Sequence, residues 1–151
     1  MTIAYVGLGS NLDDPVRRVR EAFGELERLP HTRLVRKSSL YRSAPLGHAD
    51  QPDFINAVAE LDTGLPAERL LAELQQIEAR HGRTRSFPNA PRTLDLDVLL
   101  YGELSLDLPH LKIPHPRMHQ RAFVLRPLVE LAPRLQLSFA ACANQQVERI
   151  D

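Results

Sequence analysis

The sequence is poor in several residue types that mark particular classes of protein. It holds one cysteine, Cys142, and no tryptophan among 151 residues, so an internal disulfide and a zinc-type cysteine cluster are both excluded. No apolar run approaches the roughly 20 residues that cross a bilayer, and the N-terminus lacks the pattern of a secretory signal. We therefore predict a cytoplasmic protein with no membrane partner.

The sequence also lacks an excess of charge of either sign. It has 19 Lys and Arg residues against 19 Asp and Glu residues, which predicts no nucleic-acid partner. Lysine itself is scarce: only Lys37 and Lys112 stand beside 17 arginines. Either genome base composition or a need for forked donors to phosphate explains that bias, and composition alone leaves both open.

Two common catalytic patterns are missing as well. There is no Gly-x-x-x-x-Gly-Lys-[Ser/Thr] sequence, because the glycine-rich stretch at residues 7–11 (GLGSN) matches it only superficially. No Ser/His/Asp nucleophile elbow is present either. A P-loop nucleotide enzyme and a serine hydrolase are thereby excluded.

The remaining composition is that of an ordinary globular protein, with 43% hydrophobic residues. The length fits a single domain, which we predict to span residues 1–151. Stretches rich in β-formers predict strands at residues 2–8, 33–41, 54–61 and 94–101. Apolar stripes of helical period predict helices from Pro15 to about residue 30 and from Pro66 to His81-Gly82.

The order β-α-β-β-α-β is that of a ferredoxin-like fold, so we predict an α+β ferredoxin-like sandwich with additional C-terminal elements. Those elements are a short strand or turn near residues 104–106, a His/Pro loop at 114–119 and a helix at 122–131. Asp13 or Asp14 is expected to cap the first helix.

The most informative stretch lies in the fourth predicted strand, where Asp95 and Asp97 stand two residues apart. Side chains alternate along a strand, so both carboxylates project from one face. Solvated acids on an exposed face explain that spacing equally well. Apolar neighbours favour a buried strand, however, where such a pair calls for a hard cation such as Mg²⁺.

Two further segments add charged and aromatic groups near this pair. Arg83, Arg85 and Arg92 lie on the preceding loop and offer donors suited to phosphate oxygens, although a solvated polar loop has the same composition. The later segment carries His115 between two prolines, then Arg121 and Phe123. Singly, these three residues also fit a turn, a surface position and a core position.

Taken together, five ordered blocks of the sequence resemble the 6-hydroxymethyl-7,8-dihydropterin pyrophosphokinase family. The resemblance covers most of the chain, and its most specific block is Pro-Arg-Thr-Leu-Asp-Leu-Asp. The blocks are GLGSNL at residues 7–12, SLYRSAPLG at 39–47, QPDFINA at 51–57, PRTLDLD at 91–97, and IPHPRM at 113–118 followed by RAF at 121–123.

The resemblance implies transfer of diphosphate from ATP to 6-hydroxymethyl-7,8-dihydropterin in folate biosynthesis, with AMP as the other product. Asp95 and Asp97 would hold two Mg²⁺ ions. The pterin would contact Ser43, Ala44, Pro45, Leu46, Phe54, Asn56 and Phe123. The nucleotide would contact Gln75, Glu78, Arg85, Arg92, Val98, His115 and Arg121, and the catalytic residues would be Arg83, Arg85, Arg92, Asp95 and Asp97.

This chain departs from the family pattern at three places. It lacks the tryptophan found beside the Arg-bearing loop in well-known members, Phe54 stands where tyrosine is common, and Pro116 occupies a position where an aromatic residue can occur. We expect a monomer. A non-catalytic ferredoxin-like ligand or RNA-binding module and a two-metal nucleotidyl transferase or cyclase are the competing hypotheses, and the nucleotide product separates them.

Overall fold

The computed structural model describes residues 1–45, 50–82 and 93–151. Their helices and strands follow one another as β1 (Thr2–Ser10), α1 (Pro15–Glu27), β2 (Thr32–Lys37), β3 (Tyr41–Ser43), β4 (Phe54–Thr63), α2 (Ala67–Arg80), β5 (Asp95–Tyr101), β6 (Leu106–Leu108), β7 (Leu111–Ile113), the 3₁₀ turn η1 (Met118–Gln120), α3 (Ala122–Leu131), η2 (Pro133–Leu135), η3 (Ala140–Cys142) and β8 (Val147–Arg149).

The main sheet is antiparallel and has the strand order β5-β1-β4-β3-β8, with β2 also paired to β4. Strands β5, β1, β4 and β2 give the pairing of a split β-α-β unit, so the prediction of a ferredoxin-like fold is confirmed. The hairpin of β6 and β7 and the edge strand β8 are the additional C-terminal strands.

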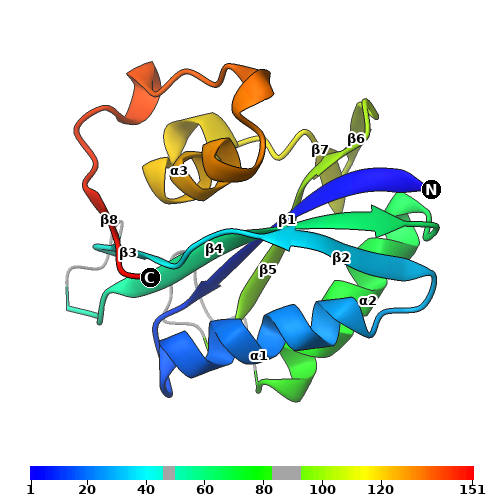
Figure 1. Ribbon diagram of the computed structural model, residues 1–151, viewed down its shortest axis with the longest axis horizontal. Helices are drawn as coiled ribbons and strands as arrows, with labels where there is room; N and C mark the ends of the chain where they lie inside the picture. Colours follow the sequence, from blue (N-terminus) through cyan, green and yellow to red (C-terminus); the bar gives the residue numbers. More distant parts are fainter. Residues whose placement is uncertain (46–49, 83–92) are drawn as a thin grey trace.

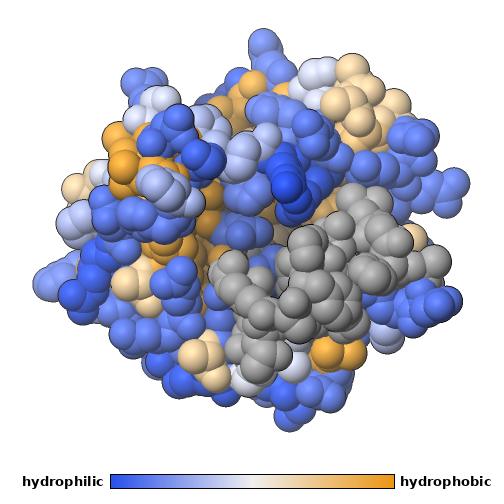
Figure 2. Space-filling view, turned by 180° about the vertical axis from the view of Figure 1, so that it is seen from behind, coloured by the Kyte–Doolittle hydropathy of each residue, from blue (hydrophilic) through white to orange (hydrophobic). Residues whose placement is uncertain are grey.

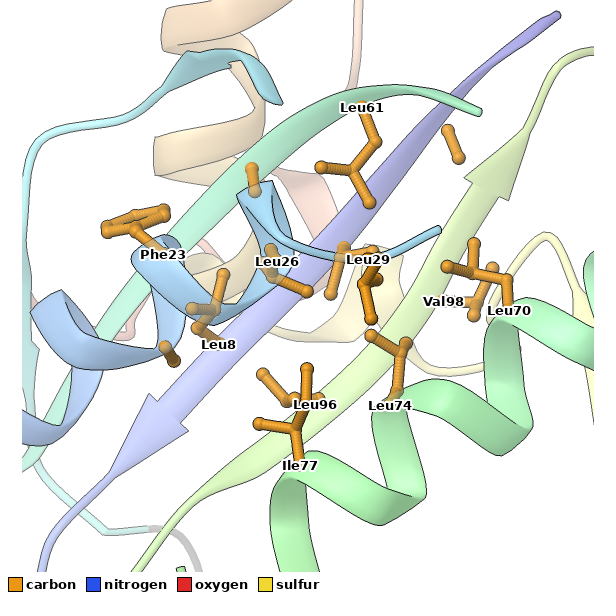
Figure 3. Packing of buried hydrophobic residues seen from close by; sticks show 14 of the residues in the cluster. Leu8, Phe23, Leu26, Leu29, Leu61, Leu70, Leu74, Ile77, Leu96 and Val98 are labelled. Atoms are coloured by element: carbon orange, nitrogen blue, oxygen red, sulfur yellow. The ribbon is translucent and has the colours of Figure 1, made fainter. Parts of the chain in front are cut away.

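Helices cover both faces of this sheet (Figure 1). Helices α1 and α2 lie on one face, where their leucines pack against Leu8, Leu96 and Val98 of the strands (Figure 3). Burial of such side chains contributes roughly 1.5–3 kcal/mol each, as an upper estimate. Helix α3 covers the other face, packing around Leu99 and Val58. That helix is shorter than the strands beneath it, so it covers only part of its face.

Several predicted boundaries were wrong. The predicted strand at 33–41 is two strands, β2 and β3, because the backbone N–H of Ser39 bonds to the Glu130 carboxylate of α3 instead of a neighbouring strand. Strand β1 continues past residue 8 to Ser10, since Gly9 pairs with Asn56 of β4 and with Asp95 of β5. The C-terminal strands β7 and β8 are too short to have been predicted.

The start of α1 also differs from its prediction. Asp14 occupies the N-cap position, but its φ of 62° is left-handed and its side chain makes no capping hydrogen bond. A capping side chain normally needs an extended backbone at this position. The Asp14 carboxylate instead pairs with Arg17 at 3.4 Å. By contrast, the predicted C-terminal signal of α2 is confirmed, since the helix ends at Arg80 with His81 as its C-cap and Gly82 in a left-handed conformation, and α3 spans residues 122–131 as predicted.

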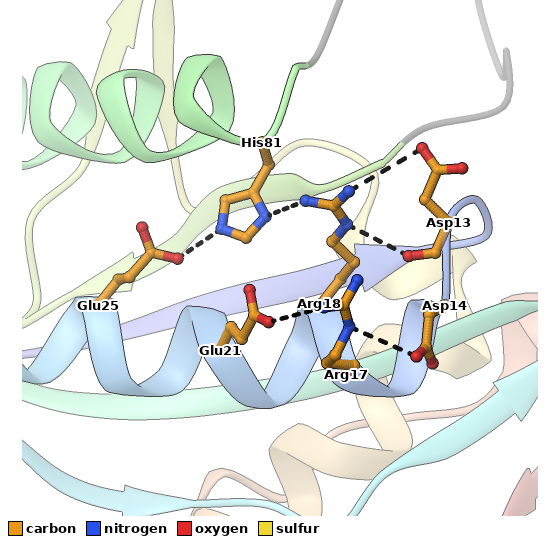
Figure 4. A network of polar contacts seen from close by, with 7 residues as sticks. All are labelled: Asp13, Asp14, Arg17, Arg18, Glu21, Glu25 and His81. Carbon is orange, nitrogen blue, oxygen red and sulfur yellow. Dashed lines mark hydrogen bonds and ion pairs between the residues drawn. The ribbon is translucent and has the colours of Figure 1, made fainter.

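Buried His81 connects the end of α2 to α1 (Figure 4). Its Nδ1 lies 3.0 Å from the guanidinium of Arg18, and its Nε2 contacts the Glu25 carboxylate. Arginine only donates, so Nδ1 accepts that bond and Nε2 carries the proton that is donated to Glu25. The neutral ring therefore joins an acid and a base of α1, and Arg18 continues the network to the backbone carbonyl of Asp13.

The surface is mostly hydrophilic on the side shown in Figure 2, where apolar residues appear as small separate patches. Within the described part of the chain, no helix combines the length and the apolar character needed to cross a membrane.

We predict that His81→Ala lowers the free energy of unfolding by roughly 1–3 kcal/mol, because it leaves a largely buried carboxylate and a guanidinium without their shared partner. His81→Gln should recover most of that loss, since its amide can accept from Arg18 and donate to Glu25. Urea unfolding measures both, with exposed His119→Ala as the control. Equal midpoints for wild type and His81→Ala would contradict the role of this network.

Candidate active site

The acidic strand β5 carries its two predicted carboxylates on the face that α3 only partly covers. Leu94, Leu96 and Val98 are buried toward α1 and α2, whereas Asp95 and Asp97 are half-buried on the opposite face. The predicted alternation is therefore confirmed. The two acids share one face and are held at a fixed spacing by the backbone.

Two glycines of β1 lie beside these acids. In the antiparallel register, Gly9 pairs with Asp95 and Gly7 pairs with Asp97, and directly opposed residues point to the same face. A side chain on Gly9 would lie 3.4 Å from the Asn56 amide oxygen, and one on Gly7 would meet Leu99. Because glycine has no side chain, the sheet is open between the acids and the neighbouring strand β4.

This opening is the floor of a pocket, here called the central pocket. Aromatic rings, an amide, an arginine and both acids surround it, so its lining combines flat apolar groups with charged ones. It is lined by Gly7, Leu8, Gly9, Ala44, Phe54, Asn56, Asp95, Asp97, Leu99, Arg121, Phe123 and Val124.

Asn56 is the buried polar group of the central pocket. It is 3% exposed and pairs with Gly9 across the strands. Its amide nitrogen donates to the Ser43 hydroxyl of β3 at 2.8 Å. Since that bond fixes the orientation of the amide, an oxygen acceptor and a second N–H remain defined in position.

A second pocket, here called the lateral pocket, opens on the other side of β5. Its lining comes from α2, from β5 and from the segment between β6 and η1: Leu71, Gln75, Glu78, Leu96, Asp97, Val98, Pro109, His110, Leu111, Lys112, His115 and Pro116. Asp97 lines both pockets. A ligand in either pocket therefore approaches the same carboxylate.

Glu78 is buried between α2 and β5, with an exposure of 4%. Its carboxylate accepts the backbone N–H of Leu96 at 2.8 Å, and Leu96 stands between the two acids. The predicted nucleotide-facing residue thus lines the lateral pocket while holding the acidic strand against α2. A charge-assisted bond of this kind is stronger than one between neutral groups.

His115 sits beside Asp97 at the edge of the lateral pocket. Its backbone N–H donates to the Leu99 carbonyl at 3.0 Å, and its Nδ1 accepts the backbone N–H of Arg117 at 3.2 Å. Burial, followed by the positive charge of Arg121, lowers the pKa of His115 below its usual value. The ring is therefore neutral near pH 7, and its Nε2–H lies 4.0 Å from an Asp97 oxygen.

The structure brings most of the predicted site residues into these two pockets. Ala44, Phe54, Asn56 and Phe123 line the central pocket, while Gln75, Glu78, Val98 and His115 line the lateral pocket. Arg121, which was predicted to contact the nucleotide, lines the central pocket instead. Ser43 does not line the central pocket, but its hydroxyl accepts a hydrogen bond from Asn56. Pro45 is half-buried beside Ala44 and lines neither pocket. Leu46, Arg83, Arg85 and Arg92 lie outside the described residues.

Several lining residues were not predicted from the sequence. Leu99 shares the face of the two acids, so strand alternation could have identified it. Leu71 lies one helical turn before Gln75, and the period of α2 likewise places it on the same face. His110 and Lys112 of the lateral pocket lie on and beside β7, whose three residues left no usable pattern.

The donor set resembles an open metal site more than a closed cage. Among residues 1–45, 50–82 and 93–151, no group of three or more His, Cys, Asp or Glu side chains is placed to hold an ion. The pair Asp95 and Asp97 nevertheless suits Mg²⁺, which commonly binds one or two carboxylates and completes its shell with water and phosphate oxygens. The residues present therefore fit such an ion when a phosphate ligand accompanies it.

Comparison with known proteins gives a consistent picture. The family model of 7,8-dihydro-6-hydroxymethylpterin-pyrophosphokinase matches residues 5–133. A protein of Pseudomonas aeruginosa named 2-amino-4-hydroxy-6-hydroxymethyldihydropteridine pyrophosphokinase is 53% identical over 97% of this chain and 95% of its own length. The protein of the same name from Bacillus subtilis is 38% identical over 95% of this chain and 86% of its own length.

A solved structure of HPPK-DHPS from Plasmodium falciparum shares the fold, with a TM-score of 0.70 at 14% identity over 95% of this chain. This chain spans 42% of that longer protein, so the likeness concerns the fold of one part of it. On the family match and on the identity with full-length relatives, the chain belongs to the 7,8-dihydro-6-hydroxymethylpterin-pyrophosphokinase family.

Proposed function

We propose that the central pocket binds 6-hydroxymethyl-7,8-dihydropterin, that the lateral pocket binds ATP, and that diphosphate passes between them beside Asp97. The chain is a pyrophosphokinase of folate biosynthesis, as its family and its named relatives show. The assignment of each substrate to a pocket is our proposal. The observation that carries it is the position of Asp97 in the lining of both pockets.

The central pocket has the chemistry of a pterin site. Phe54 and Phe123 both line it, and aromatic rings favour offset or edge contacts with a flat heterocycle. Asn56, oriented by Ser43, can both accept from and donate to the polar edge of such a ring. A hydrocarbon ligand would offer no partner to the Asn56 oxygen or to its second N–H, so the pocket favours a flat and polar ligand.

The lateral pocket has features suited to a nucleotide. Leu71 and Val98 offer apolar contacts to a base, whereas Gln75, Lys112 and His115 offer polar ones. Because Asp97 lines this pocket, phosphates bound there would lie next to the acidic pair. Two Mg²⁺ ions held by Asp95 and Asp97 would neutralise phosphate charge and favour deprotonation of a nearby hydroxyl.

The reaction follows from these positions. The pterin hydroxyl oxygen bonds to the β-phosphorus, the bond from that phosphorus to the oxygen bridging to the α-phosphorus breaks, AMP leaves, and the hydroxyl proton is released. Phe54, Phe123 and Asn56 hold the hydroxyl in line, and neutral His115 can donate Nε2–H to a phosphate oxygen. Arg83, Arg85 and Arg92 are proposed to contact the phosphates. Positioning and charge therefore supply most of the rate.

The same proposal extends to assembly and location. We expect a monomer to be active. Location in the cytoplasm stays a prediction from the sequence.

The first test is incubation of the protein with ATP, Mg²⁺ and 6-hydroxymethyl-7,8-dihydropterin, followed by separation of the nucleotides. We expect pterin-dependent AMP from wild type, and a loss of at least about a thousandfold in Asp97→Ala, since several kcal/mol of charge stabilisation disappear. Asp62→Ala, at the far end of β4, is the control and should keep full activity. Release of pyrophosphate instead of AMP would support a nucleotidyl transferase or cyclase.

A second prediction concerns Asn56. Asn56→Ala removes the oriented amide and should weaken pterin binding by roughly ten- to a hundredfold, the effect of losing one or two buried hydrogen bonds. ATP binding in the lateral pocket should change by less than about twofold. Equilibrium titration of each substrate, with pterin fluorescence as one signal, measures the difference, and an equal loss for both substrates would contradict the assignment.

A third prediction tests the floor of the central pocket. Valine is favoured in strands, and the backbone of Gly9 is not in a left-handed conformation, so Gly9→Val should still fold. Its side chain would occupy space between Asn56 and Asp95, and we expect pterin binding to fall by more than about tenfold. Circular dichroism and pterin titration measure the two effects. Unchanged pterin affinity would place the substrate elsewhere.

A further inference from the structure

The C-terminal segment at residues 144–149 lies beyond residue 133, where the family match ends. It nevertheless borders the central pocket. A second hollow adjoins it, and Ala44 and Phe123 line both spaces. The hollow is lined by Ser43, Ala44, Phe123, Asn144, Gln145, Gln146 and Val147. None of the residues of this segment was predicted to act in the reaction.

Gln145 bonds to the backbone on both sides of Arg121. Its side-chain oxygen accepts the N–H of Ala122 at 3.0 Å, and its side-chain nitrogen donates to the carbonyl of Gln120 at 2.9 Å. Arg121 itself has an extended backbone, with φ −130° and ψ 102°, between η1 and α3. The Gln145 amide thus hydrogen-bonds the last carbonyl of the 3₁₀ turn and the first N–H of the helix. Backbone groups at such helix ends have no partner within the helix.

The same segment is also paired with β3, the strand that carries the residue bonded to Asn56. Strand β8 pairs with β3, placing Val147 opposite Ser43, the residue that orients Asn56. Figure 1 shows this course: the chain leaves α3, passes over it and descends to lie beside β3. The segment therefore connects the start of α3, near Arg121 and Phe123, to strand β3, which carries Ser43.

Gln120 and Ala122, which Gln145 bonds, do not line the central pocket, but their chain neighbours Arg121 and Phe123 do. The Arg121 guanidinium carbon lies 5.7 Å from the centre of the Phe123 ring, so the two side chains are stacked next to each other on the first turn of α3. The backbone conformation of residues 120–122 therefore determines the position of the Phe123 ring in the pocket. Residues of the lateral pocket make no bond to Gln145 in the described part of the structure.

We infer that Gln145 is a positioning residue for pterin recognition: it holds the break between η1 and α3 so that Phe123 and Arg121 face the pterin. This inference rests on the proposed function of the central pocket. Without the Gln145 amide, water can satisfy the two backbone groups, but it does not fix the angle at which the helix begins. Arg121 and Phe123 are then no longer held in one orientation toward the pterin, whereas the lateral pocket is unchanged.

The test compares Gln145→Ala with the adjacent, exposed Gln146→Ala. We expect Gln145→Ala to weaken pterin binding by roughly five- to tenfold, the loss of about one hydrogen-bonded contact. The Kd of ATP should stay within about twofold, and Gln146→Ala should match wild type in both measurements. Pterin fluorescence titration, ATP calorimetry and steady-state KM values for each substrate give the readouts.

Gln145→Glu separates the two bonds. Its carboxylate keeps the acceptor for the Ala122 N–H and is favoured at a helix N-terminus, but it has no donor for the Gln120 carbonyl, so its pterin affinity should fall between those of wild type and Gln145→Ala. The inference is overturned by unchanged pterin affinity in Gln145→Ala, by an equal effect of Gln146→Ala, or by an equal loss of pterin and ATP binding. Absence of pterin-dependent AMP from wild type would instead refute the proposed function itself.

Discussion

The antiparallel register of β1 between β4 and β5 is the constraint on which the site depends. It aligns Asn56, Gly9 and Asp95 in one row across the sheet, with Gly7 and Asp97 two residues along. Opposed residues share a face, so the absence of side chains on the glycines opens space between an amide and two carboxylates. A shift of β5 by one residue against β1 would turn Asp95 and Asp97 into the helical core.

One face of the sheet packs against helices α1 and α2, and the other face carries the site. The packing of the first face holds the site residues on the second in place. Leu8, Leu96 and Val98 bury one face against α1 and α2, which makes β5 a fixed support for its acids. Glu78 adds a bond from α2 to the backbone of Leu96. On the other face, α3 covers Leu99 and leaves the adjoining acids open to ligand. Stability and access are thereby separated by side-chain alternation along a single strand.

Much of this arrangement could be predicted from local patterns. The split order of strands and helices, the end of α2 at Gly82 and the shared face of Asp95 and Asp97 all follow from periods of 3.6 or 2 residues and from glycine's conformational freedom. The resemblance to a known family added Asn56 and Phe54, residues that have no local pattern of their own. The predictions failed where non-local contacts compete with propensity, as when Glu130 ends the strand predicted at 33–41.

The sequence by itself determined the fold class, the pairing of acids on one strand face and the residues that form the helices, because each depends on neighbours within a few positions. Only the tertiary structure decided that Asp97 lies between two pockets, that Glu78 holds Leu96, and that Gln145 bonds on both sides of Arg121. The hydrogen bonds among them join residues 18 to 25 positions apart. Their partners are set by the packing of whole elements, and no periodicity in the sequence encodes that packing.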